Sequence, residues 1–142
     1  MKQLAAKIFA KIIFKRNQKW VNNPVKAQQE TFQKLIASGS KTLFGKEHNF
    51  SSIEQPSDFA MQVPVRDYEG LRSYVYRIVE GEEDVLWPGK PIYFSKTSGT
   101  TSGAKYIPIT EESMPTHITA ARDALLTYIH YTGKSDFLKG KQ

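Results

Sequence analysis

The stretch that decides the fold is Tyr93-Phe94-Ser95-Lys96-Thr97-Ser98-Gly99-Thr100-Thr101-Ser102-Gly103-Ala104-Lys105-Tyr106-Ile107-Pro108. No side chain from Thr97 to Ala104 is larger than threonine. The flanking segments, residues 91–94 and 106–109, are rich in β-branched and aromatic residues, which is typical of short strands. A run of small residues pinned between two strands is a rigid turn and not a free linker. The sequence therefore predicts a strand–loop–strand unit over residues 91–109.

The composition of this loop is that of an anion site. Its hydroxyl groups and successive backbone N–H groups form a donor-rich concavity, and its glycines let another group approach the chain closely. The predicted phosphate-binding residues are Ser98, Gly99, Thr100, Thr101, Ser102, Gly103 and Lys105. The spacing differs from the Walker pattern, because three residues separate the glycines and Ala104 precedes the lysine. A Ser/Thr/Gly run is often a linker or an ordinary turn, and here the apolar flanks favour the anion site.

The loop Thr97–Lys105 resembles the phosphate loop of the adenylate-forming enzymes, which activate carboxylic acids as acyl-adenylates. Five further segments precede the loop, and they resemble segments that occur in the same order in one family of that group. They are Thr42–Phe50, Asp58-Phe59, Val63–Glu69, Arg77–Glu82 and Val85–Gly89. The series from about Trp20 to Gln142 is similar to the N-terminal part of the auxin-responsive promoter family (the Gretchen Hagen acyl-acid amido synthetases), in particular its bacterial members.

The resemblance implies an α/β fold: the N-terminal portion of an adenylate-forming (firefly-luciferase-like) large domain, with helices packed on an incomplete β-sheet. Residues 1–142 would then be part of a single adenylating domain. The implied reaction uses ATP and Mg²⁺ to adenylate a carboxylic acid, which then forms an amide with an amino acid. Family enzymes are several times longer than this chain, so we expect an N-terminal fragment that is inactive alone. The pockets for the acid and the amine would lie beyond Gln142, and no catalytic residue is assigned.

Composition limits the class of protein. The chain has 142 residues, of which 39% are hydrophobic and 24% are charged, as expected for one folded domain. No apolar run approaches the roughly 20 residues of a membrane-spanning helix. The absence of cysteine excludes disulfides and Cys-based metal sites and fits a reducing compartment. We predict a cytoplasmic protein.

The first 20 residues carry a basic amphipathic pattern. Apolar residues repeat at helical spacing at Leu4, Ile8 and Ile12, with Ala5, Phe9 and Ile13 beside them. Lys7, Lys11 and Lys15 form another row at the same spacing. Such a helix can attach to a membrane surface, or it can pack its apolar stripe on the domain while its lysines face water. We expect the second arrangement. The net charge of +6 accompanies no base-stacking pattern, so nucleic acid is not the expected partner. Because we expect the helix to pack on the domain, a membrane surface is not the expected partner either.

Three more helices are predicted, from Pro24 to about Ala37, from Asp67 to about Glu80 and from Thr110 to about Thr132. Residues 41–62 are predicted to be mostly loop. The expected buried stripes of these helices are Val25, Phe32, Leu35 and Ile36, then Tyr68, Leu71, Val75 and Ile78, then Met114, Ile118, Ala121, Leu125 and Ile129.

Other chemically reactive side chains favour structural interpretations. His48 lacks a second ligand at metal-binding spacing, and we interpret it as a structural histidine. The acidic run at Glu80, Glu82, Glu83 and Asp84 is predicted to be a solvated turn, although paired carboxylates can also perform acid/base chemistry. No metal site is predicted. Two alternatives to the synthetase remain: a non-catalytic anion- or nucleotide-binding interaction module, and a basic protein that binds membrane surfaces.

Overall fold

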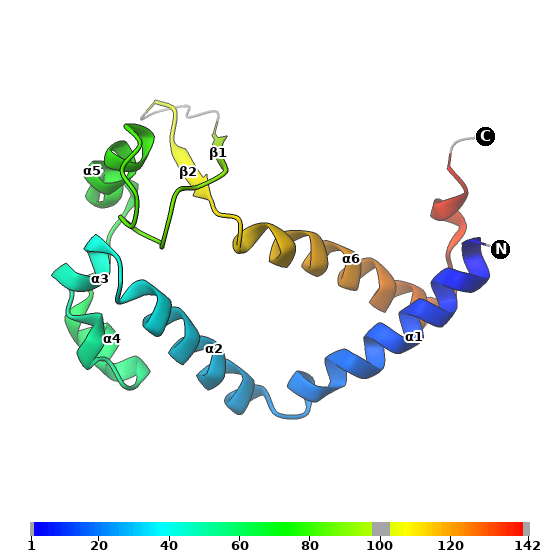
Figure 1. The fold of residues 1–142 in the computed structure, drawn as a ribbon. Coiled ribbons are helices and arrows are strands. Elements are labelled where there is room, and N and C mark those ends of the chain that lie inside the picture. Colours follow the sequence, from blue (N-terminus) through cyan, green and yellow to red (C-terminus); the bar gives the residue numbers. More distant parts are fainter. Residues whose placement is uncertain (1, 98–102, 141–142) are drawn as a thin grey trace. The chain divides into compact units, whose positions relative to one another are not determined.

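The computed structural model describes residues 2–97 and 103–140, which form two compact units (Figure 1). One unit comprises residues 1–27 and 114–142, and the other comprises residues 28–113. The elements are α1 (Lys2–Val21), α2 (Pro24–Gly39), α3 (Leu43–Glu47), η1 (Phe50–Ser52), α4 (Pro56–Gln62), α5 (Tyr68–Val79), β1 (Tyr93–Lys96), β2 (Tyr106–Ile109), α6 (Ser113–Thr132) and η2 (Asp136–Lys139). The described chain is thus mostly helical with one two-stranded antiparallel sheet. The prediction that helices outnumber strands is confirmed.

In the first unit, α1 packs on the C-terminal part of α6. Ala10 and Ile13 are buried against Leu126 and Ile129, because the small alanine lets the two helices approach closely. The predicted apolar stripe of α1 is wrong in part: Ile13 is buried, but Leu4, Ile8 and Ile12 are exposed. On α6 Ile129 is buried as predicted, but Ile118 and Leu125 are exposed and Leu126 is buried instead.

An ion cluster joins the same two helices at Asp123. Its carboxylate accepts hydrogen bonds from Arg16 at 2.6 Å, from Asn17 at 3.2 Å and from Arg122 at 2.8 Å. Burial alone would raise the pKa of Asp123, but the hydrogen bonds from Arg122 and Asn17 and the charges of Arg122 and Arg16 outweigh it and lower the pKa. The ionised carboxylate therefore stabilises the pairing of α1 with α6.

Replacing Asp123 with asparagine is expected to reduce the free energy of unfolding at pH 7 by about 1.5 kcal/mol, because charge-assisted hydrogen bonds are lost. A carboxyl whose pKa is lower in the folded state stabilises the protein above its unfolded pKa of about 3.9 and loses that effect as the pH falls. The difference between wild type and Asp123→Asn should therefore shrink below about pH 4. Urea unfolding at several pH values measures it; a difference that stays constant down to pH 2.5 would contradict the prediction.

The core of the second unit is aromatic. Ile36, Phe50 and Ile53 are buried together, and Phe32, Phe44, Phe59 and Val63 pack against them. Phe50 meets Phe44 and Phe59 edge to face or nearly so, an arrangement that aromatic rings favour.

The prediction of loop over residues 41–62 is wrong, because α3, η1 and α4 form there. These helices are too short to show hydrophobic periodicity, and local hydrogen bonds start them. Thr42 caps α3, and Asp58 accepts the backbone N–H groups of Glu54 and Gln55 ahead of α4, each at 3.0 Å. In the second case a carboxylate in the first helical turn satisfies donors that the helix cannot.

Thr42 and Gly45 form a tightly packed turn at the start of α3. The Thr42 side chain, 1% exposed, donates to the Gly39 carbonyl at 2.7 Å and accepts the Gly45 N–H at 3.0 Å. The next two amides reach across the chain, since Leu43 N–H donates to the Asp84 carbonyl at 2.7 Å and Phe44 N–H to the Val85 carbonyl at 3.0 Å. This turn therefore ties α3 to the segment that leads into β1.

The remaining helix boundaries follow local chemistry. Asp67 caps α5, as predicted, by accepting the Gly70 N–H at 2.9 Å. Helix α6 begins at Ser113, and ahead of it the Thr110 hydroxyl accepts the Ser113 N–H at 3.2 Å, the bond expected of the predicted cap. In the described part of the chain, no helix combines the length and the hydrophobicity that crossing a membrane requires.

Candidate anion-binding site

The predicted strand–loop–strand unit is present as an antiparallel hairpin. Tyr93 pairs with Ile109 and Lys96 pairs with Tyr106, and the Thr97 N–H donates to the Lys105 carbonyl at 3.0 Å. This last bond closes the neck of the loop, so both ends of the predicted phosphate-binding segment start from fixed backbone. The two strands at its ends are confirmed.

The structure describes two of the seven predicted loop residues. Gly103 has a φ of +80°, a backbone conformation that L side chains rarely adopt, and Lys105 lies at the start of β2. Ser98, Gly99, Thr100, Thr101 and Ser102 lie outside the described residues.

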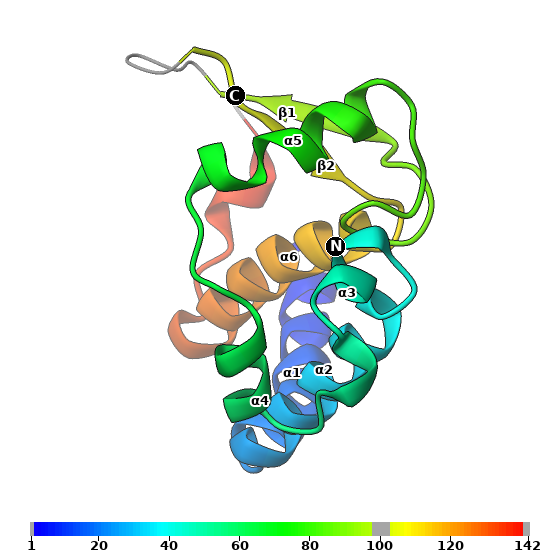
Figure 2. The ribbon, with the colours of Figure 1, turned by 90° about the vertical axis from the view of Figure 1, so that its left-hand side faces the viewer.

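Tyr68 of α5 supports the hairpin at Lys105. Its hydroxyl accepts the Tyr106 N–H at 2.9 Å, and the Lys105 Nζ lies 5.5 Å from the centre of its ring. Helix α5 lies beside the hairpin in both ribbon views (Figures 1 and 2). From the sequence, packing was the favoured role of Tyr68. Its position directly after a capping aspartate fixes it at the first turn of α5, where it reaches β2.

Further cations gather around this tyrosine. The Arg72 guanidinium lies 5.7 Å from the Tyr68 ring and forms an ion pair of 2.5 Å with Glu69, while Lys96 Nζ lies 5.9 Å from the Tyr106 ring. The hydrogen bond from Arg72 lowers the pKa of Glu69, and Lys105 contributes to the same effect. The base of the loop thus carries three cations against the carboxylates of Glu69 and Asp67, both of which act at this site, so its net charge is positive.

Arg72 also carries an unsatisfied donor. Its Nε is buried and has no hydrogen-bond partner among the residues that the structure describes, although its Nη2 donates to the Glu69 carboxylate. A buried N–H without a partner is costly.

Replacing Tyr68 with phenylalanine is expected to reduce the free energy of unfolding by about 1 kcal/mol, because the Tyr106 N–H loses its acceptor. Urea unfolding measures the change. Tyr93→Phe is the matched control, because Tyr93 is exposed and its hydroxyl has no hydrogen-bond partner among the described residues. Equal effects of the two substitutions would contradict the role of the Tyr68 hydroxyl.

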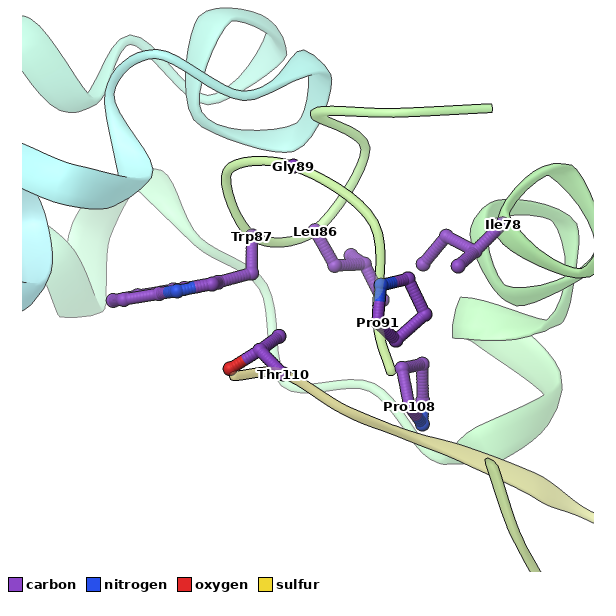
Figure 3. Close-up of a pocket in the computed structure, with 7 residues that line it drawn as sticks. All are labelled: Ile78, Leu86, Trp87, Gly89, Pro91, Pro108 and Thr110. Carbon is purple, nitrogen blue, oxygen red and sulfur yellow. The ribbon is translucent and has the colours of Figure 1, made fainter. Parts of the chain in front are cut away.

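A small apolar pocket opens beside the hairpin (Figure 3). Its volume is about 150 Å³, and it is lined by Ile78, Leu86, Trp87, Gly89, Pro91, Pro108 and Thr110. The Trp87 indole N–H donates to the Glu112 carboxylate. The pocket is below the roughly 300 Å³ at which small-molecule sites begin, and it presents few polar groups, so it does not suit a nucleotide.

His48 and the acidic run have structural partners. His48 Nδ1 lies 2.8 Å from the Phe44 carbonyl oxygen and Nε2 lies 3.0 Å from an Arg66 nitrogen. Because a carbonyl only accepts, Nδ1 donates and Nε2 accepts from Arg66.

In the acidic run, Glu82 pairs with Arg77 at 2.5 Å and Glu83 with Lys90 at 3.3 Å. The Asp84 carboxylate accepts the Gly89 N–H at 2.7 Å. The described residues contain no group of three or more histidine or carboxylate side chains that could hold a metal ion.

Comparison with known proteins identifies the family. Residues 14–141 match the GH3 family N-terminal domain. The chain is 32% identical over 91 residues to the jasmonoyl–L-amino acid synthetase JAR4 of Nicotiana attenuata, covering 63% of this chain and 16% of that protein. It is 31% identical over 117 residues to the indole-3-acetic acid-amido synthetase GH3.15 of Arabidopsis thaliana, covering 80% of this chain and 20% of that protein. The chain thus spans about a fifth or less of these relatives, and it belongs to the GH3 family, whose N-terminal domain its residues 14–141 match.

Proposed function

We propose that this chain is the N-terminal part of an ATP-dependent acyl-acid amido synthetase of the bacterial type, and that its loop holds the phosphates of ATP. The observation that carries the proposal is the β1–β2 hairpin, in which the Thr97 N–H donates to the Lys105 carbonyl and closes the loop. The side chains of Lys96, Lys105 and Arg72 lie near this point. In the complete protein, ATP would activate a carboxylic acid as an acyl-adenylate with loss of pyrophosphate, and an amino acid would take the acyl group with release of AMP.

The roles of the residues follow from charge and geometry. The backbone at Gly99 and Gly103 would approach the phosphates closely, and the hydroxyl and N–H groups of Ser98, Thr100, Thr101 and Ser102 would donate to phosphate oxygens. Lys105, supported by the Tyr68 ring, would offset the negative charge that develops as pyrophosphate leaves. Phosphoryl chemistry depends mainly on such positioning and charge neutralisation.

Magnesium fits this arrangement through the phosphates. The described residues offer no cluster of three acidic or histidine ligands, and Mg²⁺ commonly binds one or two carboxylates, several waters and the phosphates of its substrate. We therefore propose that Mg²⁺ enters with ATP, and that the protein's cations complement it.

The wider architecture is part of the same proposal. Residues 1–142 would belong to one adenylating domain of firefly-luciferase-like fold, in which further strands extend the β1–β2 sheet. The pockets for the acid and the amine would lie in sequence beyond this chain, and the enzyme would act in the cytoplasm. The chain alone would be inactive.

The test is pyrophosphate release by the complete gene product with MgATP and panels of carboxylic acids, followed by AMP release on addition of amino acids. The expected result is pyrophosphate formation that requires both ATP and an acid, and AMP release that requires an amino acid. Tight binding of ATP without any acid-dependent release of pyrophosphate would favour the non-catalytic nucleotide-binding module and overturn the synthetase. Absence of both binding and release would overturn the site itself.

A further inference from the structure

The net charge of the chain, +6, equals the charge of helix α1. Of the 20 basic residues, six lie on α1, which has no acidic residue, and the other 14 are balanced by the 14 acidic residues of the chain. The six are Lys2, Lys7, Lys11, Lys15, Arg16 and Lys19. Arg16 pairs with Asp123, whereas none of the five lysines forms an ion pair within the part of the chain that the structure describes. Helix α1 therefore presents an unneutralised basic surface.

Apolar side chains share this surface. Leu4 is 67% exposed, Ile8 56% and Ile12 57%, and their spacing of four residues places them in one row about 12 Å long. Lys7, Lys11 and Lys15 each follow one of them by three residues, so the lysines form the adjacent row. The buried contact with α6 uses Ala10 and Ile13, which lie away from the row. We call Leu4, Ile8, Ile12, Lys7, Lys11 and Lys15 the outer face of α1.

The apolar part of the outer face precedes the segment that matches the GH3 domain. The match begins at residue 14, whereas Leu4, Ile8 and Ile12 all precede it. The row therefore lies outside the matched segment, and α6 does not cover it.

We propose that the outer face of α1 binds an anionic lipid surface. An apolar row beside a row of lysines is the arrangement of helices that lie in the plane of a membrane interface. The aliphatic stems of the lysines extend along the apolar surface while their ammonium groups reach lipid headgroups. Because carboxylates are absent from the helix, nothing on it opposes an anionic surface. This inference goes beyond the proposed synthetase activity and does not depend on it.

The test is co-sedimentation of the intact gene product with vesicles of phosphatidylcholine, with and without about 30% phosphatidylserine, at low and high salt. We expect binding to the acidic vesicles at low salt, at least about tenfold stronger than to the neutral ones, and its loss as salt screens the charges. The triple variant Lys7→Gln, Lys11→Gln, Lys15→Gln should bind about a hundredfold more weakly, since each lysine near the surface contributes about fivefold.

Matched variants separate the outer face from net charge. A second triple variant, Lys34→Gln, Lys41→Gln, Lys46→Gln, removes the same number of positive charges from exposed positions outside α1. It should leave vesicle binding nearly unchanged. Ile8→Ser with Ile12→Ser should weaken it about tenfold or more by removing the apolar anchor, and circular dichroism checks that the variants stay folded. Three results would each overturn the proposal: no binding to acidic vesicles, equal loss in both triple variants, or a self-associated protein whose assembly, and not vesicle binding, depends on Ile8 and Ile12.

Discussion

Replacing Gly45 with alanine is expected to destabilise the protein by about 3 kcal/mol or more. A Cβ at this position would lie 2.0 Å from the Gly39 carbonyl oxygen and 2.7 Å from its carbon. Both are backbone atoms, so no side chain can move aside. Relief requires a shift of the end of α2 away from α3, which breaks the hydrogen bonds that Thr42 makes to both segments. Urea or thermal unfolding measures the loss.

Gly70→Ala is the matched control for this substitution. Gly70 also lies in a helix, but its added Cβ would meet the Arg66 Cβ at 3.2 Å, so a shift of a few tenths of an ångström relieves the contact. Because alanine favours helix over glycine by about 1 kcal/mol, Gly70→Ala should be neutral or mildly stabilising. A Gly45→Ala variant as stable as Gly70→Ala would contradict the close approach of α3 to Gly39.

Replacing Lys105 with methionine is expected to slow acid-dependent pyrophosphate release by the complete gene product about 100-fold or more, the typical cost of removing one group that stabilises developing charge. Methionine retains much of the side chain's length while removing the charge. Initial rates at saturating MgATP measure the effect, and unfolding measurements should show little change in stability.

Lys90→Met provides the comparison, because it removes the same charge from a lysine that pairs with Glu83 on an exposed turn. Its rate should equal that of the wild type. A Lys105→Met enzyme as fast as Lys90→Met would remove Lys105 from the phosphate site and leave that role to the loop's own donors.

The hydrophobic pattern predicted where the long helices and the strands form better than it predicted which side of each helix is buried. Helices α1, α5 and α6 and both strands form near the predicted positions. On α1, however, the large apolar side chains of Leu4, Ile8 and Ile12 were predicted to be buried, while the contact with α6 uses Ala10 and Ile13. Apolar residues occur around much of α1, so periodicity does not select one side, and the close approach of a second helix favours a small residue that a hydrophobicity scale ranks low.

The candidate site was predictable where its chemistry is local. The loop composition and its flanking strands indicated the hairpin and Lys105. Tyr68 was not assigned a role there, because its contact with Tyr106 joins residues far apart in the sequence and no local pattern marks it. Likewise Arg72 joins the loop base only through packing of α5 on β2, which sequence spacing does not reveal.

The backbone bonds of Leu43 and Phe44 have a consequence for folding kinetics. Their amides donate to the carbonyls of Asp84 and Val85, so they are protected from hydrogen exchange only while two distant segments remain joined. Joining two distant segments costs more chain entropy than forming a turn between neighbouring residues. We therefore expect the Leu43 and Phe44 hydrogen bonds to form late in folding and to open only when the whole unit opens. Exchange at these two amides would then report the cooperative opening of residues 28–113 directly.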